Sequence, residues 1–264
     1  MHRQRQIRAT IIDPRAASGF AAAAESYQRG RPSYPAQAIA VVVDALGLGG
    51  MSTVLDLAAG TGQLARLMRA RVGSVVAVEP AAAMRDKLAA DLPDVAALDG
   101  TAEAIPLADR AVDAVLVGEA FHWFRTAEAA REIARVLTAD GGLALLWNVP
   151  TWTIEDTPWL AAFREIVAGH RRAAGSYPAG DGSRRARLEQ TSLFAPLTHL
   201  QETHVQQLSS ADFVAQVASW SWIANLPIAD RQAVLTSVHE LMREQPEISI
   251  PYRTDLYWTV KGDV

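Results

Sequence analysis

Short apolar runs alternate with segments of helical spacing through the middle of the chain. The apolar runs predict strands over residues 53–57, 74–79, 95–98, 112–117 and 143–147. Apolar positions three and four residues apart predict helices between them, over residues 62–71, 81–90 and 126–137. Nearly continuous apolar strands separated by helices are typical of a parallel sheet that is covered on both faces. The pattern therefore predicts an α/β fold.

The segments on either side of this alternation carry further elements. Residues 1–18 show no periodicity and are expected to form a mobile tail, residues 20–27 fit a short helix, and residues 36–46 fit a longer one. After Asn148 the pattern predicts a helix within residues 152–168, helices over 211–222 and 229–243, and strands over 198–208 and 248–260. Pro251 lies inside the last of these strands and marks a bend or a sheet edge.

Composition narrows the class of protein. The chain has 264 residues, a formal net charge of −4 and no cysteine. An acidic balance argues against a general nucleic-acid binder, and the lack of cysteine excludes disulfides, thiolate catalysis and cysteine-ligated metals. A basic cluster at 171–187 is interpreted as a solvated loop. No apolar run reaches the roughly 18 residues needed to span a bilayer, so we expect no membrane association and a cytoplasmic location.

A glycine-rich turn follows the first predicted strand. Residues 58–62 read Ala-Ala-Gly-Thr-Gly, and Glu79 ends the second strand about 20 residues further on. Glycine lets a backbone approach a ligand closely, and a carboxylate at the second strand end can accept hydrogen bonds from ribose hydroxyls. The turn also satisfies G-x-G-x-x-A, which leaves a dinucleotide and an NAD(P)-dependent oxidoreductase as an alternative. The glycines can also serve a tight turn alone, and Glu79 can simply cap the next helix.

Two other features favour a nucleoside cofactor without a pyrophosphate. Asp56 lies inside the end of the first strand, where it can meet a positively charged group such as an ammonium, or can be structural. The loop at 100–107 follows the third strand. In open α/β sheets such loops border the crevice at the carboxyl ends of the strands, where ligands bind.

Taken together, the segments 54–64, 76–80, 100–107 and 111–117 resemble the motif set of class I S-adenosylmethionine-dependent methyltransferases. Within that class the chain is similar to the type 11 group that includes trans-aconitate methyltransferases. Two further segments carry this resemblance: Phe20 to Pro35 is similar to the group's N-terminal lid, and Glu119 to Phe124 is similar to its segment after the fourth strand. The resemblance implies a Rossmann-like, mostly parallel seven-stranded sheet with helices on both faces, and a helical insertion after the fifth strand.

The resemblance also implies how S-adenosyl-L-methionine is held. The loop with Ala58, Gly60 and Gly62 would pass the methionine part of the cofactor, and Asp56 would bind its ammonium. Glu79 would take the ribose hydroxyls.

The remaining expected contacts involve the adenine and the lid. Pro80 with Ala81 would line the adenine, and Thr101 and Ala102 would contact its edge. Many relatives have Asp where this chain has Thr101, which leaves the side-chain contact to the adenine amine open. Tyr27 and Arg31 are lid candidates, and Arg31 can pair with the carboxylate of the cofactor through its planar fork or stay solvated.

Glu119 and His122 are the catalytic candidates. Glu119 would lie at the mouth of the site near the reacting methyl group. His122 can be a general base or a residue packed between its aromatic neighbours. Nearby tryptophans can form an apolar acceptor pocket or ordinary core: Trp123, Trp147, Trp152 and Trp159. The six histidines show no metal-ligand spacing.

We therefore predict a methyltransferase that transfers a methyl group directly to a small-molecule acceptor, as a monomer or homodimer without nucleic-acid partners. A non-catalytic cofactor-binding module is a further alternative to the oxidoreductase. The whole chain is expected to form one domain. Residues 1–36 would be tail and lid, residues 37–149 the cofactor-binding core, and residues 150–264 a helical insertion with the last strands of the sheet.

Overall fold

The computed structural model describes residues 29–151, 157–171, 183–245 and 247–262. Its centre is a seven-stranded sheet in the order β3-β2-β1-β4-β5-β7-β6. The strands span Thr53–Leu57 (β1), Ser74–Val78 (β2), Ala96–Leu98 (β3), Val112–Gly118 (β4), Leu137–Pro150 (β5), Thr198–Ser209 (β6) and Glu247–Val260 (β7). Neighbours from β3 to β5 pair in parallel, whereas β7 runs antiparallel to both β5 and β6. The sheet is therefore mixed, and the expectation of a mostly parallel sheet holds only for its first five strands.

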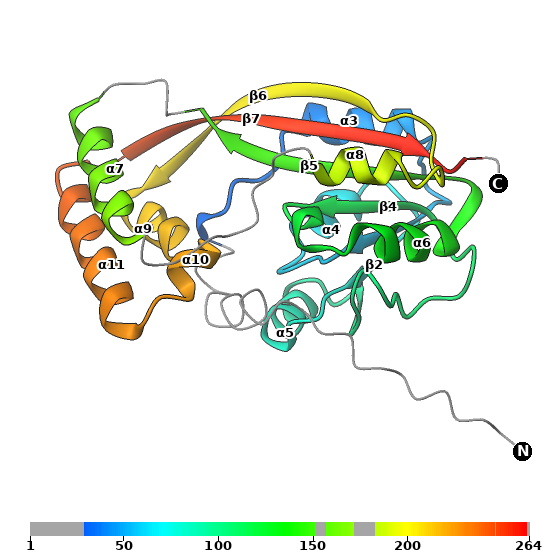
Figure 1. The fold of residues 1–264 in the computed structure, drawn as a ribbon, viewed down its shortest axis with the longest axis horizontal. Coiled ribbons are helices and arrows are strands. Elements are labelled where there is room, and N and C mark those ends of the chain that lie inside the picture. Colours follow the sequence, from blue (N-terminus) through cyan, green and yellow to red (C-terminus); the bar gives the residue numbers. More distant parts are fainter. Residues whose placement is uncertain (1–28, 152–156, 172–182, 246, 263–264) are drawn as a thin grey trace, which may run out of the picture.

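Helices cover both faces of the sheet (Figure 1). Those associated with its parallel part are Ala36–Ala45 (α3), Gln63–Met68 (α4), Ala82–Asp91 (α5), the 3-10 turn Phe121–Trp123 (η1), Thr126–Val136 (α6) and Ser183–Glu189 (α8). Alternate residues of a strand point to opposite faces. Leu55 and Val115 accordingly pack in the cluster that contains Ile133 of α6 and Leu188 of α8, whereas Val54 and Leu116 pack against Ile39 of α3 and Leu64 of α4. Burial on both faces explains why these strands read as continuous apolar runs.

A third hydrophobic cluster lies at one end of β6 and β7. It gathers helices Pro158–Arg171 (α7), Ser210–Ala218 (α9), Ser221–Ala224 (α10) and Ile228–Met242 (α11). Figure 1 shows these helices together at one end of β6 and β7, away from the parallel strands. Their buried side chains pack on Ile248 and Ile250 of β7. Helices α9 to α11 lie between β6 and β7 in the chain, so the helical insertion is not confined to the segment after β5.

Several expected boundaries were wrong. The fifth strand was expected over residues 143–147, but β5 runs from Leu137 to Pro150 because it pairs with β7 along nine residue pairs. The helix expected over residues 211–222 is divided into α9 and α10, with the break at Ser219 and Trp220. Predictions for residues 1–28, including the tail, the short helix and Tyr27, lie outside the described residues, as does Trp152.

The strand that contains Pro251 is not a sheet edge, because β7 lies between β5 and β6. The ladder between β5 and β7 ends at the pair Pro150–Tyr252, so Pro251 lies just beyond it. Its carbonyl accepts a hydrogen bond from the Thr151 N–H on that side. The N–H that proline lacks would face the same side, where the β5 ladder has ended, and proline is therefore tolerated in an interior strand.

Candidate active site at the carboxyl ends of β1 and β4

The turn after β1 has a left-handed backbone at three positions. Ala58, Gly60 and Gly62 have φ angles of 58°, 57° and 82°. A Cβ on Gly62 would lie 3.0 Å from both Leu88 Cγ and Leu92 Cδ1 of α5, so glycine also lets α4 begin close to its neighbour. Alanine in this conformation is strained by about 1–2 kcal/mol. Such strain is typical of functional sites, and the sequence motif predicts this turn.

Asp56 connects β1 to the start of α4. Its Oδ2 accepts a hydrogen bond from the Ala65 N–H at 2.9 Å, and the residue is only 3% exposed. Burial raises the pKa of Asp56 to about 7, with the nearby charge of Glu79 adding to the effect. Asp56 therefore has a structural role, because it binds the first turn of α4. It also lines the cavity described below.

Glu79 lies directly after β2 and is 6% exposed. Its Oε2 accepts from the Gly60 N–H at 2.9 Å, and its Oε1 accepts from the Ala81 N–H at 2.8 Å. Burial raises the pKa of this carboxyl, while the two N–H groups and the charge of Arg85 oppose the rise. Glu79 thus holds both the glycine turn and the start of α5. A carboxylate has about four acceptor sites, so each oxygen can accept another hydrogen bond.

The loop after β3 contains Thr101 and Ala102. Ala102 is buried, and Thr101 forms an isolated antiparallel bridge with Ala104. The Thr101 Oγ1 is also buried and makes no hydrogen bond with the residues that the structure describes. Gly100 is required here because a Cβ would lie 2.6 Å from Pro106 Cδ. The loop is therefore tightly packed, and it holds an unused hydroxyl.

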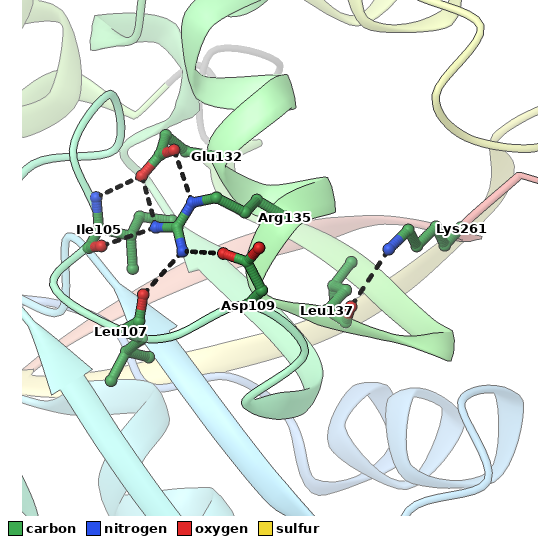
Figure 2. Close-up of polar contacts among 7 residues, drawn as sticks. All are labelled: Ile105, Leu107, Asp109, Glu132, Arg135, Leu137 and Lys261. Carbon is green, nitrogen blue, oxygen red and sulfur yellow. Dashed lines mark hydrogen bonds and ion pairs between the residues drawn. The ribbon is translucent and has the colours of Figure 1, made fainter. Parts of the chain in front are cut away.

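An arginine of α6 fixes the far end of this loop (Figure 2). Arg135 donates to the carbonyls of Ile105 at 2.9 Å and Leu107 at 2.7 Å. It also pairs with Glu132 at 2.8 Å and Asp109 at 2.9 Å, and Glu132 accepts from the Ile105 N–H. The hydrogen bond from Arg135, with that from the Ile105 N–H, lowers the pKa of Glu132. No local pattern in the sequence indicates this network, which anchors the segment that carries Thr101 and Ala102.

A cavity of about 120 Å³ opens at the carboxyl ends of β1 and β4. One side of the cavity is formed by residues at the strand ends of the sheet and beside them, and the opposite side by residues from other segments. The sheet side contributes Asp56, Ala58, Ala59, Gln63, Leu64, Gly118, Glu119, Asn148 and Pro150. The opposite side contributes Arg31, Pro32, Tyr34, Gln216, Trp220 and Tyr252. Of the predicted site residues, the structure brings Asp56, Ala58, Glu119 and Arg31 together at this cavity. Others are not among its described lining residues: Gly60, Gly62, Glu79, Pro80, Thr101 and Ala102.

Glu119 follows β4 as Ala58 follows β1. It too has a left-handed backbone, with φ of 57°, and its N–H donates to the Leu146 carbonyl at 2.9 Å. Its Oε1 accepts a hydrogen bond from the Asn148 N–H. Burial raises the pKa of Glu119, and the positive charge of Arg31 opposes this rise. The carboxyl is thus held in one orientation at the cavity wall.

Arg31 is bound to the end of α9. Its Nε donates to Ser219 Oγ at 3.2 Å and its Nη2 donates to the Ser219 carbonyl at 3.3 Å. The neighbouring Pro32 and Ser33 carbonyls accept from Asn148 Nδ2 at 3.3 and 3.5 Å. The segment 30–34 is therefore tied to α9 on one side and to β5 on the other, over the cavity.

His122 lies apart from this cavity. It belongs to η1, its ring centroid is 5.2 Å from that of Trp123, and it is not among the described residues that line the cavity. Of the tryptophans singled out in the sequence, the three that the structure describes do not line it either. Trp147 packs edge-on against Tyr257, Trp159 packs against Phe213, and Trp123 borders a separate surface groove beside α6 and α8. The tryptophan of the cavity is Trp220.

Sequence reasoning missed several cavity residues: Tyr34, Asn148, Gln216, Trp220 and Tyr252. They come from separate segments spread between residues 34 and 252, which local patterns cannot connect. One available signal was Gly118, which ends β4. A Cβ there would lie 2.4 Å from Tyr34 Oη, so glycine marks a point of close approach.

The described residues include no group of three or more histidine, aspartate or glutamate side chains arranged to hold a metal ion. In the same part of the chain, no helix is both long and apolar enough to cross a membrane.

Comparisons with known proteins agree with this geometry. The profile of a family described as "Methyltransferase domain" matches residues 55–145, which include the turn, Glu79 and Glu119. A protein of Mycobacterium tuberculosis named as an uncharacterized methyltransferase is 37% identical over 244 residues, covering 89% of this chain and 92% of its own. Another protein with that name, from Schizosaccharomyces pombe, is 31% identical and covers 83% and 85% of the two chains.

The fold is also similar to solved structures. The crystal structure of the YcgJ protein from Bacillus subtilis has a TM-score of 0.55 and 17% identity, covering 86% of this chain and 99% of that one. The matches do not single out the trans-aconitate group. With the turn, the buried acids and the sheet order, they identify the chain as a member of the class I S-adenosylmethionine-dependent methyltransferases, with S-adenosylmethionine as its cofactor.

Proposed function

We propose that this chain transfers a methyl group to a small-molecule acceptor whose reacting end enters the cavity between segment 30–34 and the ends of β1 and β4. The observation that carries this proposal is the cavity itself. Its volume of about 120 Å³ is below the roughly 300–1,000 Å³ typical of drug-sized sites and equals the share of about four water molecules. A space of this size favours a compact chemical group over a folded macromolecule.

The buried polar groups fit the cofactor. Asp56 and Glu79 are buried carboxyls that accept hydrogen bonds from backbone N–H groups, and their other lone pairs suit an ammonium and ribose hydroxyls. The hydroxyls of Thr61 and Thr101 are buried and make no hydrogen bond with any described residue. Buried polar groups are nearly always paired. A ligand with a sugar, an amine and a purine would supply the missing partners.

Most of the predicted cofactor contacts keep their roles in this proposal. Asp56 binds the ammonium, and Glu79 binds the ribose. The strained turn with Ala58, Gly60 and Gly62 passes the methionine part, and Pro80, Thr101 and Ala102 border the adenine. Arg31 donates two hydrogen bonds to Ser219 at the cavity wall, and its planar guanidinium suits the cofactor's carboxylate.

The bound cofactor supplies a methyl group that is already activated on a sulfonium. The chain's own contribution is to position the acceptor in line and to exclude water, which can provide several kcal/mol. Glu119 is the group placed to take up the proton that an O–H or N–H acceptor loses, because its carboxyl lies at the cavity and burial raises its pKa. The position of His122 outside the cavity lining favours Glu119 over His122 for this role.

The test measures S-adenosylhomocysteine formed from S-adenosylmethionine in the presence of small phenols, alcohols, amines and acids, with transfer RNA and a protein mixture as controls. We expect product with a member of the small-molecule panel, and we expect Glu119→Gln to lower the rate while leaving the affinity for S-adenosylhomocysteine unchanged. Calorimetry with S-adenosylhomocysteine and with NADH accompanies it. Product formed only with RNA or protein, or binding of NADH alone, would contradict the proposal.

A further inference from the structure

The hydroxyl of Tyr252 belongs to the cavity wall and to a chain of three polar side chains. Tyr252 lies on β7, is 4% exposed and lines the cavity beside Gln216. Its Oη accepts a hydrogen bond from Gln216 Nε2. The same Nε2 donates to Gln206 Oε1 at 3.4 Å, and Gln206 Nε2 donates to the Gly30 carbonyl at 3.1 Å.

The donor and acceptor roles in this series of hydrogen bonds are fixed by the Gly30 carbonyl. A backbone carbonyl can only accept a hydrogen bond, so Gln206 must present its nitrogen to Gly30 and its oxygen to Gln216. Exchanging the amide oxygen and nitrogen of Gln216 would place two acceptor oxygens, Gln216 Oε1 and Gln206 Oε1, against each other. The Gln216 nitrogen therefore faces both Gln206 and Tyr252.

The anchor of the chain is held by packing. A Cβ on Gly30 would lie 2.2 Å from the Gln216 Cα and backbone nitrogen, so the Gly30 backbone rests directly on α9. Gln216 is itself 2% exposed, and the Tyr252 ring stacks on His204 with centroids 5.5 Å apart. These contacts leave little freedom for the three side chains to reverse their order.

One consequence concerns the hydrogen of the Tyr252 hydroxyl. Since Oη accepts from Gln216, its own hydrogen remains available for an acceptor in the cavity. Burial raises the pKa of Tyr252 to about 12, and the charges of Arg31 and Glu119 act on it in opposite directions. The hydroxyl therefore stays protonated at neutral pH and can donate.

We propose that Tyr252 is a specificity-determining hydrogen-bond donor of the acceptor pocket, and that the methyl acceptor carries a carbonyl or oxyanion oxygen that Tyr252 Oη binds. This inference rests on the proposed function. A substrate that places an ammonium at this point has no lone pair to accept the hydrogen bond. Gln206 acts through Gln216 and is a positioning residue.

The experiment compares two probes with the same five-carbon ring, cyclopentanone and cyclopentylamine, which is an ammonium at pH 7.5. Dissociation constants are measured by ligand-observed NMR with and without saturating S-adenosylhomocysteine. We expect Tyr252→Phe to weaken cyclopentanone binding about three- to tenfold, the range expected for one neutral hydrogen bond. Binding of cyclopentylamine should stay unchanged, because the ring that packs on His204 is retained.

Gln206→Met is a second variant. It changes the hydrogen bond to Gln216 without changing a described residue of the cavity lining. It should weaken cyclopentanone binding by a smaller factor and leave the affinity for S-adenosylhomocysteine unaltered. The proposal is overturned if wild-type protein does not bind cyclopentanone, if Tyr252→Phe leaves that binding unchanged, or if it weakens both probes equally. Failure of the proposed function would appear separately, as methyl transfer only to RNA or protein, or as wild-type protein that binds NADH and not S-adenosylhomocysteine.

Discussion

Glu79 and Gly60 are joined by a hydrogen bond of 2.9 Å between the carboxylate Oε2 and the backbone N–H. This bond connects the end of β2 to the turn after β1, which are 19 residues apart in the chain. The acid that we assign to the ribose therefore also shapes the turn that passes the rest of the cofactor. A substitution of Glu79 acts on both.

The first prediction separates these two roles. Glu79→Ala should weaken S-adenosylhomocysteine binding by about 1–3 kcal/mol, because a buried charge-assisted acceptor is lost. Glu79→Gln keeps one acceptor oxygen and should lose less. Isothermal calorimetry measures both, and urea unfolding reports how much of the effect comes from the turn. An unchanged affinity in Glu79→Ala would show that the ribose assignment is wrong.

Asp56 predicts a pH dependence of cofactor binding. Its pKa is raised to about 7 by burial, and an ammonium requires the ionised carboxylate. Affinity should therefore be constant above pH 8 and fall by up to about tenfold per unit as the pH drops below 7. Calorimetry in buffers of different ionisation enthalpy should also detect proton release at pH 6.

The matched variant is Asp56→Asn, which keeps an acceptor for the Ala65 N–H. It should bind the cofactor weakly at all pH values and release no proton from this position. In the protein without cofactor, the free energy of unfolding should change with pH in the opposite direction to the cofactor affinity. Because the folded pKa lies above the ordinary value of 3.8, burial of Asp56 reduces the free energy of unfolding as the pH rises through that window. A pH-independent wild-type affinity between pH 6 and 8 would contradict the assignment.

Arg135 predicts a stability effect away from the cavity. Its guanidinium holds two carbonyls and two carboxylates (Figure 2), and methionine can replace only its apolar stem. Arg135→Met should lower the free energy of unfolding in urea by about 1.5–3 kcal/mol, the range for hydrogen bonds to charged groups. Arg243→Met is the control, because the Arg243 side chain is exposed and makes no hydrogen bond or ion pair with the described residues.

The same ion pair should respond to acid. The pKa of Glu132 is held below its ordinary value of 4.5, so the stability that the pair contributes is complete above that value and is lost as the pH falls through the lowered pKa. The difference between wild type and Arg135→Met should therefore shrink below pH 4.5. An equal difference at pH 7 and pH 3 would show that packing, not the ion pair, carries the effect.

The close contact between Gly118 and Tyr34 predicts that substitutions at the two positions have coupled effects on stability. Gly118→Ala places a Cβ 2.4 Å from Tyr34 Oη and 3.0 Å from Leu64 Cδ1, and overpacking of this kind destabilises by about 1–3 kcal/mol. Tyr34→Phe removes the nearest atom, so the double variant should recover part of the loss. A double-mutant cycle from urea unfolding measures this coupling, and strictly additive effects would exclude the contact.

Local motifs predicted the residues that we assign to the cofactor. The turn at residues 58–62, Asp56, Glu79 and Glu119 are adjacent to strand ends that the apolar runs define, and parallel strands bring their carboxyl ends to one edge of the sheet. Each residue is therefore positioned by the strand that precedes it. The same logic predicted the seven strands, although β5 is longer because pairing with β7 extends it.

The acceptor side could not be predicted in this way. Tyr34, Gln216 and Tyr252 meet only because segment 30–34 is tied to α9 and β5, and no spacing in the sequence encodes those long-range bonds. The tryptophan predictions failed for the same reason. Local sequence does not distinguish Trp220, which lines the cavity, from Trp147 and Trp159, which pack elsewhere. His122 follows β4 closely, yet the η1 turn places it outside the cavity lining.

The most direct test of the central claim is a crystal structure of the protein with S-adenosylhomocysteine. We predict that the ribose hydroxyls lie within hydrogen-bond distance of the Glu79 carboxylate, with the sulfur at the cavity bordered by Ala58 and Glu119. A complex in which the nucleoside binds elsewhere while this crevice stays open and ordered would contradict the account.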